Sequence, residues 1–127
     1  MYLIWYTWVM DKIITVKFYC THLGNEPVRE WLKGLNKQDK QIIGEDIKTV
    51  EYGWPLGMPL VKKLEPNLWE VRSDLTNKAI ARILFTVKEN VMVLLHGFIK
   101  KSQKTPAPDL KTAKERRNQV LKKEVIL

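Results

Sequence analysis

Three segments decide the fold of this chain: LWEVRSD (Leu68–Asp74), KAIARILFTV (Lys78–Val87) and VMVLLHGFI (Val91–Ile99). Each is rich in β-branched and aromatic residues, and apolar positions recur with a period of two, which is typical of strands. Thr76-Asn77 and Glu89-Asn90 supply turn residues between them. The pattern therefore predicts an antiparallel meander of three strands.

The residues before the meander predict one strand and two helices. Ile13–Cys20 alternates as a strand, and Asn25 is a candidate N-cap for a helix that starts at Pro27. Asn36, with Asp39 three residues later, predicts the cap of a second helix. The helices have apolar stripes with helical spacing: Val28, Trp31, Leu32 and Leu35 in the first, and Ile43, Ile47 and Val50 in the second. We expect an antiparallel helical hairpin, followed by a proline-rich connection over 54–66 with room for one short strand.

A last helix is predicted to begin at Asp109, and Leu110, Ala113, Arg117, Val120 and Leu121 share one side of it. The predicted order is βααβββα, which gives an α+β fold with an antiparallel sheet. With 127 residues, one domain over 11–127 is expected. Gly97 is expected to mark a bulge or a close backbone approach.

The first ten residues, MYLIWYTWVM, stand apart from these patterns. They are too few to span a bilayer, which needs about 20 apolar residues, and they lack the features of a signal peptide. We expect residues 1–10 to be an extension outside the fold, with an extra edge strand or a hydrophobic partner contact as the alternatives. The single cysteine, Cys20, excludes a disulfide framework and favours the cytoplasm.

The charge of the chain is concentrated near its end. The net charge is +8, and residues 100–124 hold nine Lys or Arg against three acidic residues. Such a localised basic surface favours binding to a polyanion, of which nucleic acid is the commonest, although a solubilising helix face would show the same composition. The spacing of the Cys, His, Asp and Glu residues does not match that of metal ligands, so a metal site is not expected. No other cofactor is expected either.

Candidate site residues lie on the meander and just after it. If the first hairpin is centred on Asn77, Arg72 and Arg82 become cross-strand partners, and two like charges need an anion between them. Glu70 or an RNA phosphate could supply that anion, whereas an exposed, solvated sheet face is the simpler interpretation. His96 is the other ordinary acid–base candidate, although a lone strand histidine is more often a packing residue.

The run LLHGFIKKSQKTP (Leu94–Pro106) resembles the signature of a phage-derived toxin family within the RelE/HigB superfamily of type II toxin–antitoxin modules. LWEVR, ARILFTV and AKERR, which begin at Leu68, Ala81 and Ala113, extend the resemblance over roughly residues 11–120. It implies a RelE-like fold in which helices pack on one sheet face and RNA binds in a groove on the other. It also implies a metal-independent mRNA endoribonuclease that acts in the ribosomal A site, inhibits translation and pairs with a helix-turn-helix antitoxin.

Carried onto this chain, the resemblance implies catalytic roles for Arg72, Arg82, Lys100 and Lys101. Glu70 and His96 are lesser catalytic candidates, and the RNA-binding candidates are Gln103, Lys104, Arg116 and Arg117. Cleavage by the RNA 2′-hydroxyl needs a base, cations at the phosphate oxygens and a proton donor, which these residue types can provide. A non-catalytic RNA- or DNA-binding regulator and a degenerate toxin that only binds its antitoxin remain alternatives, and a neighbouring gene for a helix-turn-helix protein would favour the toxin.

Overall fold

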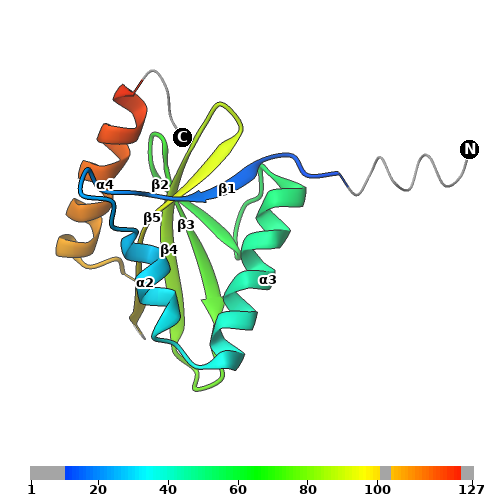
Figure 1. Cartoon of the computed structure of the whole chain (residues 1–127). Helices are drawn as coiled ribbons and strands as arrows, with labels where there is room; N and C mark the ends of the chain where they lie inside the picture. Colours follow the sequence, from blue (N-terminus) through cyan, green and yellow to red (C-terminus); the bar gives the residue numbers. More distant parts are fainter. Residues whose placement is uncertain (1–10, 101–103, 124–127) are drawn as a thin grey trace, which may run out of the picture.

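The computed structural model describes residues 11–100 and 104–123, which form an α+β fold around one five-stranded sheet (Figure 1). The expectation for residues 1–10 lies outside the described residues. In chain order the elements are β1 (Thr15–Phe18), α2 (Pro27–Lys33), α3 (Lys37–Gly53), β2 (Val61–Glu65), β3 (Leu68–Asp74), β4 (Ile80–Lys88), β5 (Val91–Lys100) and α4 (Ala107–Lys122). The predicted α+β class, the meander and the three helices are confirmed.

The sheet has the strand order β1-β5-β4-β3-β2 and is mixed, not antiparallel throughout. Strands β2 to β5 pair antiparallel, whereas β1 lies parallel to β5, with Thr15 opposite Val91. The chain between β1 and β5 contains two helices and three strands, which is long enough to bring it back to the same end of the sheet, as a parallel pair requires. Strand β2 is the fifth member of the sheet and is additional to the four strands of the predicted order. It lies in the proline-rich connection 54–66, where the sequence left room for one short strand.

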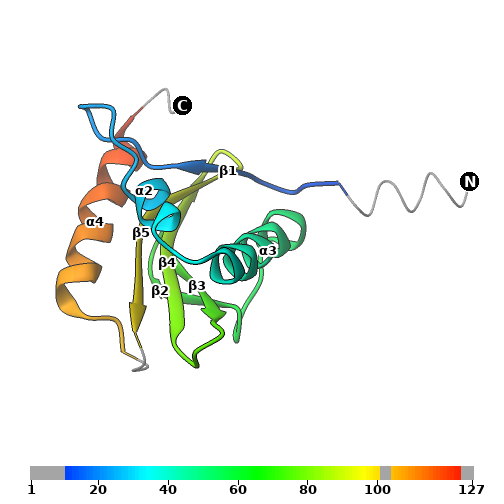
Figure 2. The same cartoon turned by 60° about the horizontal axis from the view of Figure 1, so that its bottom comes forward.

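Two layers of helices enclose the sheet, as Figure 2 shows, with α3 on one side and α4 on the other. Helices α2 and α3 cover different strands, since α2 contacts β1 and β5 while α3 contacts β3. The α2–α3 side of the sheet holds an apolar core that includes Val71, Ile83, Phe85 and Leu94. The α4 side holds a smaller apolar cluster that includes Leu68, Leu84, Val93 and Leu95, packed against Ala113 and Val120 of α4.

The ends of the helices follow the sequence only in part. Asn36 caps α3 as predicted, because its side chain accepts a hydrogen bond from the Asp39 backbone N–H at 2.8 Å. Asn25 does not cap α2, since the cap position falls on Glu26 and the Asn25 backbone N–H donates instead to Thr21 Oγ1 at 3.1 Å. Helix α4 begins two residues before Asp109, with Pro106 at the cap.

Two local predictions on the meander are confirmed. Glu89 and Asn90 have positive φ angles of 51° and 63°, as a tight hairpin turn with matching twist requires. Gly97 is the site of a close approach, since a Cβ added there would lie 2.6 Å from Cε3 of Trp31. The bulge itself falls nearby, where Leu84 pairs with His96 and Phe85 pairs with Leu94.

None of the helices in residues 11–100 and 104–123 combines the length and apolar character that crossing a membrane requires.

Candidate functional site

The polar residues of the meander gather on the α4 side of the sheet. Strand pairing places Arg72 opposite Arg82, as the sequence predicted, and places Leu84 between Glu70 and His96. Two neighbouring rows of side chains therefore share this side of the sheet: one runs from Glu70 to His96, and the other contains the two arginines.

Glu70 lies between the arginines, which confirms that it can serve as the anion of this cluster. Its Oε1 is 3.7 Å from Nε of Arg72 and 3.7 Å from Nη1 of Arg82. The expectation that Arg82 faces an open groove is wrong, because the side chains of Arg82 and Glu70 are 0% exposed and that of Arg72 is 13% exposed. An apolar surround makes such charges costly unless they are paired, which is the role that Glu70 fills here.

Burial also affects the acid–base behaviour of Arg82. Desolvation lowers the pKa of its guanidinium below the usual range, the Glu70 carboxylate acts to raise this pKa, and the nearby Arg72 charge acts to lower it. An arginine remains protonated under these conditions, so Arg82 is a fixed cation and not a proton donor.

Thr105, which lies just before α4, contacts the same cluster. The hydroxyl of Thr105 donates a hydrogen bond of 2.9 Å to Oε2 of Glu70. Helix α4 then runs across β4 and β5 on this side. The open RNA groove that the family resemblance implied is therefore covered over these strands, because α4 packs where the groove was expected. Sequence reasoning missed Thr105, whose only signal was a hydroxyl in a polar loop.

His96 forms a polar contact between the sheet and the first turn of α4. Its Nε2 lies 2.6 Å from Oδ1 of Asp109, and the two side chains are 22% and 26% exposed. Asp109 was expected only as the start of the helix, but it lies in the first turn and reaches β5. A carboxylate on an imidazole orients the ring and selects which nitrogen carries the hydrogen, an arrangement common in acid–base sites.

The basic residues at the end of the meander and after it differ in exposure. Lys100, the last residue of β5, is exposed and pairs with Ile80, one row beyond the two arginines. Lys104 is exposed in the segment that leads to α4. Lys101 and Gln103 lie outside the described residues.

The two arginines of α4 both make contacts within the protein. Arg116 donates from Nη1 to the backbone oxygen of Leu95 at 2.7 Å, and its Cζ lies 5.3 Å from the centre of the Tyr19 ring. Arg117 is buried and pairs with Glu65 of β2. That hydrogen bond is the main reason that the pKa of the Glu65 carboxyl is lowered. Arg117 thus fastens α4 to β2, which differs from the surface position that an RNA contact needs.

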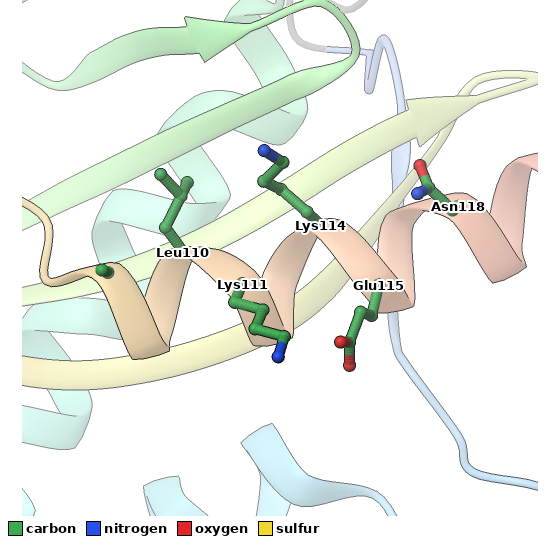
Figure 3. A pocket seen from close by; sticks show the side chains of 6 residues that line it. Leu110, Lys111, Lys114, Glu115 and Asn118 are labelled. Atoms are coloured by element: carbon green, nitrogen blue, oxygen red, sulfur yellow. The ribbon is translucent and has the colours of Figure 1, made fainter.

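Two pockets border α4. The larger, of about 400 Å³, is lined by residues of α4 itself, and Figure 3 shows Leu110 and Lys114 on one flank of the helix with Lys111 and Glu115 on the other. The smaller, of about 220 Å³, lies where α2, β5 and α4 meet, and it is lined by Pro27, Val28, Trp31, His96, Gly97 and Arg116. Only the smaller pocket contains one of the acid–base candidates.

The described part of the chain contains no group of three or more His, Cys, Asp or Glu side chains positioned to hold a metal ion. The candidate site consists of the buried Glu70, Arg72 and Arg82 cluster, the partly exposed pair of His96 and Asp109, and the exposed Lys100 and Lys104.

No curated protein matches the sequence. A family model does match, and it covers residues 30–118, from within α2 to the last turns of α4. The match spans all of the sheet except β1 and includes every described residue of the site. The chain belongs to the family described as phage derived protein Gp49-like.

Proposed function

We propose that this Gp49-like protein is the toxin of a type II toxin–antitoxin module of the RelE/HigB superfamily, and that it cleaves mRNA in the ribosomal A site. The observation that carries the proposal is the group of cations on the α4 side of the sheet, in which Lys100 lies one row beyond the arginine pair. Family membership and the basic segment 100–124 support it. The activity would arrest translation in the cytoplasm, with no metal or other cofactor.

Each cation has a distinct role in this proposal. The exposed Lys100 stabilises the charge that builds on the phosphate, and the exposed Lys104 attracts the RNA backbone. Arg72, at the edge of the buried cluster, contacts a phosphate oxygen. Arg82 acts through Glu70, whose carboxylate holds both guanidinium groups. Direct contact between Arg82 and RNA would require the Thr105 segment to move away from Glu70. Lys101 and Gln103, which lie outside the described residues, are proposed to contact the RNA as well.

The experiment is induced expression followed by mapping of mRNA 5′ ends. The wild-type chain should arrest growth and produce new 5′ ends within translated codons, and co-expression of a helix-turn-helix antitoxin should abolish both effects. Lys100→Ala should lower cleavage by roughly a hundredfold if this lysine stabilises the charge that builds on the phosphate. The matched control is Lys40→Ala, because Lys40 is an exposed lysine of α3 on the opposite side of the sheet.

A second candidate function is favoured by the burial of Arg82 and Glu70. A protein that binds RNA, DNA or an antitoxin without cleaving RNA needs only the exposed basic surface. Its Arg82 and Glu70 side chains can remain buried. Growth arrest without new 5′ ends would support this candidate. Absence of both growth arrest and new 5′ ends would contradict the toxin proposal.

A further inference from the structure

The pocket of about 220 Å³ between α2, β5 and α4 exists because of two features of β5. Strand β1 ends at Phe18, opposite Leu94, so beyond this point the edge of β5 that faces away from β4 borders α2 and α4 instead of a strand. Gly97 has no side chain, and the Trp31 ring occupies the position that a Cβ would need. The backbone and the ring thus form the floor of a pocket at the end of the sheet.

The walls of this pocket carry acid–base and cationic groups in fixed positions. His96 is held by Asp109 at 2.6 Å, and Arg116 is held by the Leu95 oxygen at 2.7 Å and by the Tyr19 ring. When Nε2 of His96 donates to the Asp109 carboxylate, Nδ1 is the ring nitrogen that can take a proton from a substrate. The guanidinium of Arg116 has five N–H donors, so its bond to Leu95 leaves donors for a phosphate.

The position of the pocket relates it to the arginine cluster. His96 shares a row with Glu70, and the neighbouring row on the same side of the sheet, two residues along each strand, holds Arg72, Arg82 and Phe98, so His96 and Arg82 are diagonal neighbours. Diagonal neighbours of this kind are separated by about 7–8 Å. Unlike Arg82, His96 is partly exposed, so an RNA strand can reach it without movement of α4.

We propose that this pocket binds one nucleotide of single-stranded RNA, that Arg116 contacts its phosphate, and that His96, oriented by Asp109, is the general base of cleavage. This inference rests on the proposed ribonuclease function. The ribose 2′-oxygen attacks phosphorus, forming the O2′–P bond while the P–O5′ bond breaks. The 2′-hydroxyl proton passes to Nδ1 of His96. Water gives a proton to the leaving 5′-oxygen, and the resulting hydroxide takes the proton from the imidazolium, so the products are a 2′,3′-cyclic phosphate and a 5′-hydroxyl.

The test measures single-turnover cleavage of a defined mRNA on programmed ribosomes across a range of pH, with wild type and His96→Gln. His96→Gln should lower the cleavage rate by about 10²–10⁴-fold and remove one limb of the pH–rate profile. The matched control is His22→Gln, which changes the other histidine of the chain, an exposed loop residue, and should leave the rate and its pH profile unchanged.

Two further variants separate chemistry from structure. Asp109→Asn, a change in a positioning residue, should lower kcat by a smaller factor, on the order of tenfold, and leave KM unchanged. Arg116→Ala should weaken binding of a single-stranded RNA that carries a 2′-deoxyribose at the cleavage site and is therefore not cleaved. A purely structural His96–Asp109 contact would instead lower the thermal midpoint and leave the pH–rate profile of the folded fraction unchanged.

The outcomes distinguish the inference from the function on which it rests. If wild type and His96→Gln cleave at the same rate with the same pH profile, the inference is wrong and the ribonuclease function stands. If the wild-type chain does not cleave RNA on the ribosome, the function and the inference are both wrong. If His96→Gln fails to fold, the rates of Asp109→Asn and the RNA binding of Arg116→Ala decide the question.

Discussion

The two sides of the sheet are both covered by helices, but different kinds of residue pack beneath those helices. On the α2–α3 side, Trp54, Trp69 and Phe85 contact one another with ring centroids 5.0–5.9 Å apart, over a continuous apolar core. On the α4 side, the apolar cluster is interrupted by Glu70, Arg72 and Arg82. Apolar burial would stabilise the second side at least as well as a buried ion cluster does. The α2–α3 side is therefore held by apolar packing alone around these rings, whereas packing on the α4 side also depends on the pairing of buried charges.

The largest effect is expected from removing the anion of the α4 side. Glu70→Leu should lower the free energy of unfolding by about 3–5 kcal/mol, because the fully buried Arg82 loses its carboxylate partner. Urea denaturation measures the loss. In the double variant with Arg82→Met, the two changes should be strongly non-additive, since the second removes the charge that the first leaves uncompensated. Additive losses would mean that the two residues are not coupled.

A somewhat smaller effect is expected from the aromatic group of the α2–α3 side. Trp69→Ala should cost about 3 kcal/mol, at the lower end for a buried tryptophan, because this ring is only partly buried against the core. The measurement is again urea denaturation. RNA cleavage by the folded fraction should be unchanged. A variant that keeps its stability and loses only RNA cleavage would show that the division between the two sides is wrong.

The close approach at Gly97 tests how rigidly α2 is held on β5. Gly97→Ala should cost about 1–3 kcal/mol, because the new methyl group would overlap the Trp31 ring. The matched control is Gly44→Ala in α3, where an added Cβ meets nothing within 4 Å, and this change should raise the thermal midpoint. A Gly97→Ala protein as stable as wild type would indicate that Trp31 can move aside.

The smallest effect is expected at acid pH. Since the pKa of Glu65 is lower in the folded protein than its ordinary value of 4.5, its pairing with Arg117 contributes stability above pH 4.5 that is lost as the pH falls through the folded value. Glu65→Gln should therefore flatten the fall in thermal midpoint below pH 4.5. Glu115→Gln, on the opposite flank of α4 from Lys114 (Figure 3), should keep the wild-type slope. Equal slopes in all three proteins would contradict this role for Glu65.

The features that could be predicted from the sequence are those set by residues close together in the chain. Period-two alternation and a hairpin centred on Asn77 were enough to place Arg72 opposite Arg82 and to suggest Glu70 as their counter-ion. A capping residue and its partner three positions later were enough to start α3 at the right place. These features involve residues that are near in sequence or related by one hairpin, so the spacing alone carries the information.

Long-range docking could not be predicted in the same way. The burial of Arg82, the Thr105 contact and the pairing of His96 with Asp109 all depend on how α4 packs over β4 and β5. A helical stripe shows which side of α4 is apolar but not which strands it covers or in which direction it runs. The parallel pairing of β1 with β5 is hidden for the same reason, because parallel partners share no turn.

That parallel pair has a consequence for the order in which the chain can fold. The meander β3–β4–β5 closes through short turns and can form early, whereas β1 must wait for β5, which is synthesised near the end of the chain. Pulse-labelled hydrogen exchange should accordingly show amide protection in β4 before β1. During synthesis on the ribosome, α2 and α3 emerge with their apolar stripes before any sheet exists to cover them. The nascent protein therefore depends on the later strands to cover these helices, and translation products truncated before β5 would leave the apolar stripes of α2 and α3 exposed to aggregation and proteolysis.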